Sequence, residues 1–201
     1  MAPTVTALRE RRDGCVAVAL DGEEWRVLPA DAVVRAGLQI GHSLDRERAR
    51  TLAREVRRAK ALRAAGRVLR YRDLSTQRLA ERLTKRGISS EARDQAIETL
   101  TGTGLLDDER FARSRAQALS DRNLGDAAIR HDLEAQGVGP ELLQRALAGL
   151  PPERERAERV VSRRGRSAAT ARYLARRGFD ADALELTAPD AFAADPPAEL
   201  G

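Results

Sequence analysis

Residues 83–88 read LTKRGI, residues 133–138 read LEAQGV and residues 174–179 read LARRGF. In each stretch a leucine lies four positions before a glycine, and an apolar residue follows the glycine directly. This spacing is typical of a Schellman turn, in which a left-handed glycine ends a helix and the next apolar residue folds back onto the last turn. Three copies in one register predict three helix–turn–helix units. The residues concerned are Leu83, Gly87, Ile88, Leu133, Gly137, Val138, Leu174, Gly178 and Phe179.

The repeat extends beyond these turns. From Gly87 to Gly137 the spacing is 50 residues, and the same spacing relates several apolar positions, such as Leu74 to Leu124. The third copy lies 41 residues further on and is less regular, because Gly165 stands where the other copies have a leucine. Thr170 likewise replaces an apolar residue. Repeated helical units bury their apolar faces against their neighbours, so we expect an extended, stacked, mostly α-helical protein.

The beginning of the chain has a different pattern. Three short apolar runs, at residues 5–8, 15–20 and 25–28, are separated by Asp-Gly turn signals and predict a small antiparallel sheet. A short helix over 31–36 should end at Gly37. From residue 44 the period becomes helical, and one apolar stripe should run from Ala49 through Leu52 to Gly66 and Leu69.

These patterns divide the chain into five predicted parts. They are a strand-rich segment (1–43), a basic helix with the first helical module (44–104), a second module (105–150), a third, degenerate module (151–187) and a disordered acidic tail (188–201). At the start of the second module, Asp107 is a natural N-cap, and the acids that include Asp108 favour the positive end of a helix dipole. Phe111 follows in the first turns, and Leu106 should pack against it as a hydrophobic staple.

Charge is distributed unevenly along the chain. The 36 Lys and Arg residues exceed the 31 Asp and Glu residues, which gives a formal net charge of +5. Residues 46–72 hold 11 basic residues and two acids, and residues 162–178 hold six arginines and no acid. Clustered cations of this kind indicate a surface for a polyanion. An arginine-rich genome would leave a similar bias, so clustering is the informative feature.

Several classes of function are disfavoured by the residues present. Neither lysine lies in a glycine-rich phosphate loop, and His42 and His131 are too few and too far apart for a metal cluster. We therefore expect no catalytic residues, no metal and no cofactor. The single Cys15, the early charges of residues 9–13 and the lack of a long apolar stretch predict a cytoplasmic protein with no membrane partner.

Candidate binding residues are the cations on the predicted repeat helices. Arginine can bind phosphate through two parallel hydrogen bonds, and Tyr173 could stack on an unpaired base. The same arginines could instead contact acidic patches of a protein, and the group on the first repeat helix could equally be an ordinary solvated face. The candidates are Arg72, Arg78, Arg82, Lys85, Arg86, Arg122, Arg163, Arg164, Arg166, Arg172, Tyr173, Arg176 and Arg177.

The segment between the first two repeats, residues 105–112, reads LLDDERFA. Together with the leucine–glycine turns on either side, it makes the sequence resemble RecX, the bacterial regulatory family that modulates the RecA recombinase. The resemblance covers about residues 57–186. It implies tandem three-helix modules in an elongated, curved array that binds the RecA filament on single-stranded DNA and restrains its growth or stability. It implies no nucleotide hydrolysis by this chain.

The expected partners are therefore the RecA filament, single-stranded DNA and also double-stranded DNA, with the chain acting as a monomer. Two alternatives stay open. A basic helical-repeat protein that binds nucleic acid on its own would use the same arginines. A protein-interaction scaffold would bind its partner without DNA and with little dependence on salt.

Overall fold

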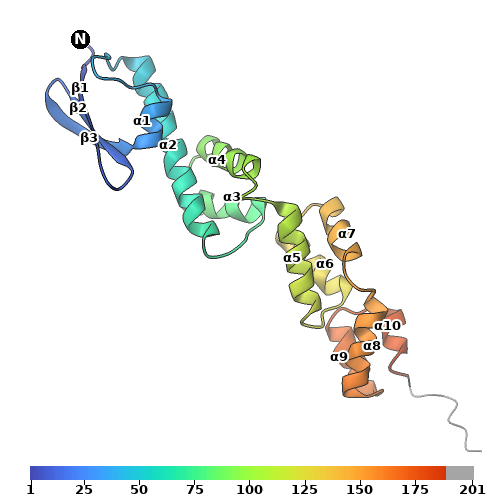
Figure 1. The fold of residues 1–201 in the computed structure, drawn as a ribbon. Helices are drawn as coiled ribbons and strands as arrows, with labels where there is room; N and C mark the ends of the chain where they lie inside the picture. The colour runs from blue at the N-terminus through green and yellow to red at the C-terminus, as the bar shows by residue number, and fades with distance from the viewer. Residues whose placement is uncertain (189–201) are drawn as a thin grey trace, which may run out of the picture. The chain divides into compact units, whose positions relative to one another are not determined.

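A computed structural model describes residues 1–188 of the chain (Figure 1). The chain divides into two compact units, Met1–Asp107 and Asp108–Gly201. The predicted mostly α-helical fold class with a small N-terminal β segment is confirmed, because a three-stranded sheet is followed by helices up to residue 188. The predicted acidic tail lies outside the described residues from residue 189 onward.

The N-terminal sheet is a β-meander. Strands β1 (Val5–Glu10), β2 (Cys15–Leu20) and β3 (Glu23–Pro29) pair antiparallel in the order β1-β2-β3. The second connection uses Asp21 and Gly22, with φ of 49° and 92°. Positive φ at both central residues is the type I′ arrangement, which matches the right-handed twist of the two strands. The strands predicted from the Asp-Gly turn signals are therefore confirmed.

One face of the sheet is covered by two helices, α1 (Ala30–Arg35) and α2 (Arg46–Leu69). Val16 and Val18 alternate along β2 and point into the core that also contains Leu52 of α2. Helix α1 ends as predicted, because Gly37 has φ of 60° and its neighbour Leu38 donates back to the carbonyl of Val33.

Helix α2 serves two cores along its length. Its first half contributes Leu52 beneath the sheet, and its second half packs Ala64, Ala65 and Val68 against α3 (Thr76–Lys85) and α4 (Ser90–Gly102). The predicted stripe is wrong at Gly66, which is exposed, whereas Leu62 and Leu69 lie at the border of the second core. A helix that packs in two directions cannot keep one apolar face.

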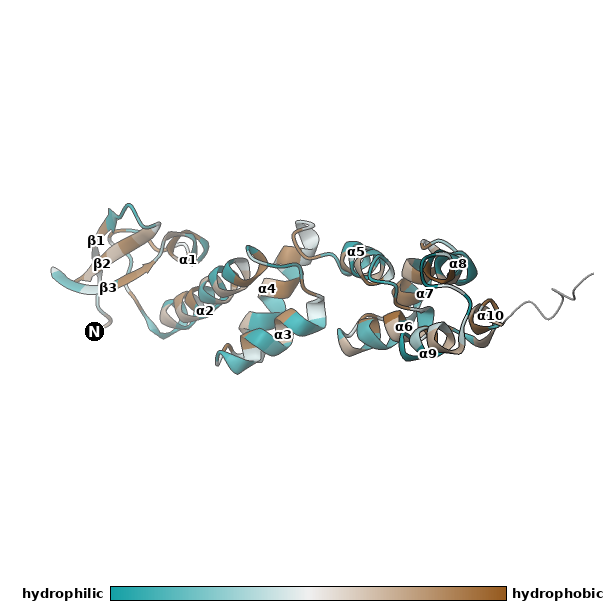
Figure 2. Ribbon diagram, turned by 90° about the horizontal axis from the view of Figure 1, so that it is seen from below, coloured by the Kyte–Doolittle hydropathy of each residue, from teal (hydrophilic) through white to brown (hydrophobic). Residues whose placement is uncertain are grey.

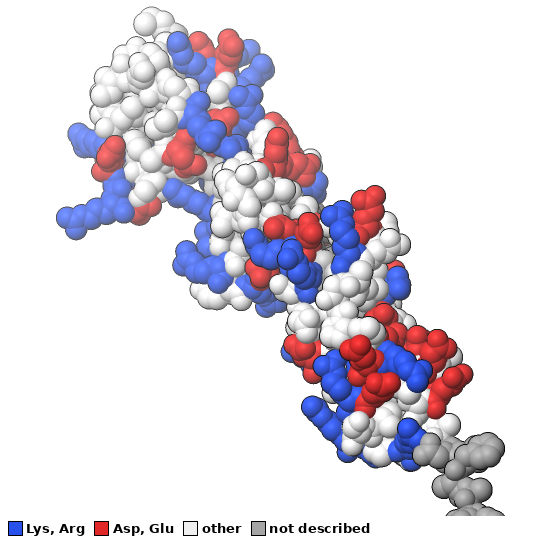
Figure 3. Space-filling view, turned by 45° about the vertical axis from the view of Figure 1, so that its right-hand side comes forward, with Lys and Arg blue, Asp and Glu red and all other residues white. Residues whose placement is uncertain are grey.

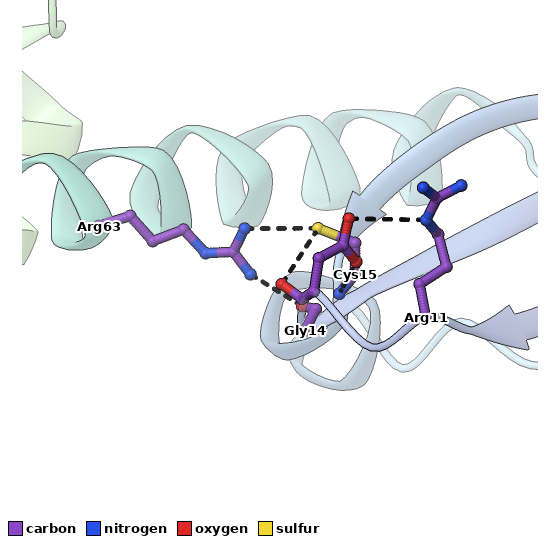
Figure 4. Close-up of polar contacts among 5 residues, drawn as sticks. Arg11, Gly14, Cys15 and Arg63 are labelled. Carbon is purple, nitrogen blue, oxygen red and sulfur yellow. Dashed lines mark hydrogen bonds and ion pairs between the residues drawn. The ribbon is translucent and has the colours of Figure 1, made fainter.

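A polar contact ties the β1–β2 turn to α2 (Figure 4). The guanidinium of Arg63 donates to the Gly14 carbonyl at 2.8 Å and lies 3.4 Å from the Cys15 sulfur. Gly14 itself has φ of 71°, which lets the turn bring its carbonyl towards the helix. The sheet is therefore held on α2 by a hydrogen bond at its turn as well as by its apolar face.

The three Schellman turns are confirmed. Gly87, Gly137 and Gly178 have φ of 74°, 77° and 79°. The amide after each glycine donates to the carbonyl of the leucine five positions earlier, at 3.1, 3.1 and 3.2 Å. In each case that leucine is fully buried. The repeat seen in the sequence is thus a repeat of one hydrogen-bonded turn.

The second unit contains two helical cores. Helices α5 (Asp108–Ser120), α6 (Asp126–Ala135) and α7 (Pro140–Ala148) enclose Phe111, Ile129 and Leu133. Helices α8 (Glu153–Arg164), α9 (Ala168–Arg176) and α10 (Ala181–Glu185) enclose Val160, Leu174 and Phe179. The separation of hydrophobic from hydrophilic residues along these helices is visible in Figure 2.

The start of α5 follows the prediction only in part. The helix begins at Asp108, so Asp107 stands at the N-cap position. Leu106, however, packs in the core of α2–α4, whereas Phe111 packs in the core of α5–α7. Leu106 and Phe111 therefore pack in different cores and do not form the expected staple.

The third copy departs from the first two at the start of its second helix. Ser75 caps α3 eight residues before Leu83, whereas Ser167 caps α9 seven residues before Leu174. Thr170 is buried, and its hydroxyl lies 3.1 Å from that of Ser167. The threonine thus satisfies its hydroxyl at the cap instead of contributing an apolar side chain. Among residues 1–188, none of the helices combines the length and apolar character needed to cross a lipid bilayer.

The turn glycines generate a stability prediction. Gly87 is exposed, and a Cβ there would meet nothing within 4 Å, so its cost is purely conformational. We expect Gly87→Ala to lower the free energy of unfolding by about 1 kcal/mol because an L-residue is strained in the left-handed region. Urea unfolding measures this change. Gly102→Ala, at the last residue of α4 and equally uncrowded, is the matched control and should stabilise by up to about 0.5 kcal/mol. Equal effects at the two sites would contradict the role given to Gly87.

Candidate nucleic-acid and partner-binding surfaces

The first group of candidate cations lies on α3 and the loop before it. Arg82 and Lys85 are exposed in the last turn of the helix, Arg86 is its C-cap, and Arg72 is exposed in the preceding loop. Cations at a helix C-terminus are favoured by the helix dipole. The dipole therefore stabilises Arg82, Lys85 and Arg86 at the end of the helix but not Arg72, and all four side chains are open to a ligand.

Arg78 differs from its neighbours on α3. Its Nη1 donates to Glu81 Oε2 at 2.8 Å, and this hydrogen bond is the main reason that the pKa of Glu81 is lowered. The side chain is half-buried. Of the predicted α3 cations, Arg78 is thus the one engaged with a carboxylate of its own helix.

Tyr71 was not among the predicted residues. It lies between Arg70 and Arg72 in the loop after α2, and its side chain is 82% exposed. An aromatic ring flanked by arginines at a helix end was the signal available in the sequence. Exposed rings of this kind offer a stacking surface to unpaired bases.

The second group of candidates surrounds the α8–α9 connection. Arg163 and Arg164 end α8, Arg166 lies in the connection, and Arg172 and Arg176 lie on α9; all five are exposed. The acid-free run of the sequence therefore forms a helix end, a loop and a helix face that lie together in one module.

Tyr173 lies beneath two arginines of this group. The Arg164 guanidinium carbon lies 4.2 Å from the centroid of the ring, and that of Arg177 lies 5.2 Å from it. The ring is half-buried and packs against the core of α8–α10. A cation over the face of an aromatic ring is attracted by its quadrupole, so the tyrosine holds both guanidinium groups.

Arg122 belongs to the same cluster, although it is distant in sequence. The Nη1 of Arg177 donates to the backbone carbonyl of Arg122 at 3.4 Å. Arg122 follows α5 in a turn that ends with Asn123 at φ of 58°. The structure thus brings Arg122, Arg164, Tyr173 and Arg177 together, whereas the α3 candidates belong to the other unit.

A joint, formed by two backbone hydrogen bonds between the start of α6 and the end of α9, positions this cluster. The amide of Gly125 donates to the Arg177 carbonyl at 2.8 Å, and the amide of Ala127 donates to the Gly178 carbonyl at 3.2 Å. A Cβ at Gly125 would overlap the Gly178 backbone, and one at Gly178 would lie 2.8 Å from the Cβ of Ala128. Only glycines allow this approach, so Gly178 ends α9 and also docks it on the N-terminus of α6.

Arg156 reinforces the joint from α8. Only 3% of the residue is exposed, and its guanidinium donates to the carbonyls of Leu124 at 2.7 Å and Pro151 at 3.1 Å, and to the carboxylate of Asp126. Its guanidinium carbon also lies 5.9 Å from the centre of the Phe179 ring. Sequence reasoning missed this residue. The available signal was an arginine four positions before Val160, in the apolar stripe of α8.

Glu153 completes the joint. Its Oε1 accepts the amide of Asp126 at 2.9 Å in the first turn of α6. Burial raises the pKa of Glu153, and the hydrogen bond from the Asp126 amide opposes this effect only in part. The charged form of this carboxyl is therefore held in the folded state at some cost.

The surface around these groups is not uniformly basic. Figure 3 shows acidic side chains (red) among the basic ones (blue) on the face drawn of the second unit. Several arginines there are paired, as in Arg115 with Asp132 at 2.7 Å and Arg154 with Glu158 at 3.4 Å. Among the described residues, only some of the cations lack a carboxylate partner, and Arg164 and Arg177 are two of them.

Comparison with known proteins identifies relatives of this chain. Residues 107–147 match the family profile described as RecX, second three-helix domain. Regulatory protein RecX of Stenotrophomonas maltophilia is 33% identical over 132 residues, which cover 61% of this chain and 80% of that protein. Regulatory protein RecX of Mycobacterium leprae is 35% identical over 102 residues, which cover 49% of this chain and 59% of the relative.

Solved structures show the same fold. A crystal structure of regulatory protein RecX superposes with a TM-score of 0.79 at 20% sequence identity, covering 92% of this chain and 98% of the other. At this level of identity the match concerns the architecture alone.

The joint generates a second prediction. Arg156→Met should lower the free energy of unfolding of the second unit by about 3 kcal/mol because buried acceptors and Asp126 lose their donor. Chemical denaturation measures the loss. Arg154→Met, on the same helix but exposed, should cost under about 1 kcal/mol. If Arg156→Met lowered the free energy of unfolding no more than Arg154→Met, the stabilising role given to Arg156 would be wrong.

A third prediction concerns pH. Because the pKa of Glu153 is raised in the folded state, its contribution to stability is full below the ordinary glutamate pKa of about 4.3 and falls as the pH rises through the folded value. Glu153→Gln keeps an oxygen acceptor without the charge, so it should be more stable than the original chain at neutral pH. Urea unfolding at several pH values should show this advantage shrinking in acid. A less stable Gln variant at neutral pH would contradict the prediction.

Proposed function

The chain belongs to the RecX family of regulatory proteins, and we propose that it inhibits the RecA recombinase by binding the RecA–single-stranded-DNA filament and limiting its growth or stability. The observation that carries the proposal is the repeat of one glycine-ended helical module, with exposed cations on α3 and on the α8–α9 connection. A filament presents the same surface at each subunit, and repeated modules suit a repeated target.

Repetition also explains how binding could be strong without one dominant contact. When one module is bound, the next is held near its own site, so its binding is effectively intramolecular. Each module then needs only a modest contact with a RecA subunit or with the DNA. The exposed Arg82, Lys85 and Arg86 in the first unit and Arg163, Arg172 and Arg176 in the second are the proposed contact residues.

We propose that the protein acts as a regulator and not as an enzyme. The protein would act in the cytoplasm, as a monomer, on filaments that contain single-stranded DNA, with double-stranded DNA as a further polyanionic partner. The exposed arginines would lower the charge of the DNA backbone and release its counterions, so binding should weaken as salt increases.

A second candidate is a helical-repeat protein that binds nucleic acid without RecA. The observation in its favour is the cluster of Arg164 and Arg177 on Tyr173, which could bind phosphate without any protein partner. This candidate predicts tight binding to bare DNA and no effect on RecA beyond competition for the strand.

The test is the single-stranded-DNA-dependent ATPase rate of RecA from the same organism, titrated with this protein. We expect suppression at well below one molecule per RecA, because blocking growth at filament ends requires few molecules. An unchanged rate at excess protein, with RecA loading intact, would contradict the proposal and favour the second candidate.

Charge variants sharpen this test. Replacing Arg82, Lys85 and Arg86 by Ala should raise the concentration needed for half inhibition about tenfold, equivalent to about 1.4 kcal/mol of binding. Replacing Arg9, Arg12 and Arg35 removes the same charge outside the helical modules and should leave inhibition unchanged. Equal losses in both variants would mean that only net charge matters.

A further inference from the structure

The two guanidinium groups over Tyr173 stand in an unusual electrostatic position. Their guanidinium carbons lie 4.2 and 5.2 Å from the centre of one ring, so a single tyrosine holds two like charges. Among residues 1–188 neither guanidinium forms an ion pair with a carboxylate. Like charges held this way repel, and the repulsion is relieved when an anion binds between or beside them.

Both arginines lie at helix ends, and both side chains are held on the Tyr173 ring. Arg164 is the last residue of α8, directly before Gly165, whose φ of 80° ends the helix. Arg177 is the C-cap of α9; its backbone carbonyl accepts from Gly125 and its side chain donates to Arg122. Fixed donors lose less entropy when a ligand binds, so this pair is preorganised.

The ring itself has little free face to offer. Tyr173 is half-buried, packs on the core of α8–α10 and lies under both guanidinium groups. Stacking of an unpaired base on this ring would have to displace an arginine. The arrangement therefore favours a ligand that binds the N–H groups of the two guanidinium groups and leaves the ring face to them.

We propose that Arg164, Tyr173 and Arg177 form a clip for a backbone phosphate of single-stranded DNA, in which Tyr173 positions the arginines and stacks on no base. The inference rests on the proposed function, because it names the DNA contact of that surface. Guanidinium groups match the oxygens of phosphate through paired, charge-assisted hydrogen bonds. Such a clip would bind DNA of any base sequence, which suits a protein that must act wherever a filament forms.

The first experiment measures binding of the full chain to two labelled strands of equal length, one of thymidines and one abasic, by fluorescence anisotropy without RecA. A phosphate clip binds both strands alike. Arg164→Ala and Arg177→Ala should each weaken binding roughly fivefold, and each should lower the slope of log affinity against log salt by about 0.7. Arg154→Ala, which removes the same charge from α8, should change neither value.

Two variants of the tyrosine separate positioning from stacking and from folding. Tyr173→Phe keeps the ring and should bind both strands like the original chain. Tyr173→Leu removes the platform and should lose as much affinity as one arginine variant, while its circular dichroism melt shows that the module is folded. Two results would overturn the clip. One is normal DNA binding by Tyr173→Leu. The other is weaker binding to the abasic strand than to the thymidine strand that is seen only when Tyr173 is present.

The outcomes also distinguish this inference from the proposed function. If the arginine variants bind bare DNA normally but lose inhibition of RecA, the groups contact an acidic protein surface and the phosphate clip is wrong. If the original chain binds DNA through the clip but leaves the RecA ATPase rate unchanged, the clip is supported and the proposed function is wrong.

Discussion

The close backbone approach of Gly125 to Gly178 is the constraint on which the second unit depends. Two amides at the start of α6 donate to the two carbonyls that end α9, and any side chain at either glycine would separate them. The buried guanidinium of Arg156 then satisfies the carbonyl of Leu124 and the carboxylate of Asp126 beside this contact. The result is a polar joint between two small apolar cores, and it places Arg177 beside Arg122.

One turn thus has two uses in this protein. At Gly87 and Gly137 the left-handed glycine ends a helix and sends the next apolar residue back to its own core. At Gly178 the same turn also offers its free carbonyls to another module. Helix ends carry unpaired carbonyls in any case, so using them as acceptors for a neighbouring helix start satisfies both ends at once.

The arginines of the chain have different physical roles. Arg156 is buried and structural, and Arg78 is paired on its own helix. Arg164 and Arg177 are held on a tyrosine and have no carboxylate partner among residues 1–188. A guanidinium can do all of this because it is planar, always charged and rich in donors. Total basic charge is therefore a poor guide to the binding surface, and the partner of each arginine decides its use.

Local patterns in the sequence determined most of the fold. Asp-Gly turns, caps and leucine–glycine spacing depend on the conformations of a few neighbouring residues, and they predicted the strands, α5 and the three helix ends. The cations of the candidate surfaces could also be read from clustering. Only tertiary structure decided which arginine is buried, that Arg122 meets Arg177, and that α2 divides its faces between two cores. Those outcomes depend on contacts between segments far apart in the chain, for which a local pattern carries no information.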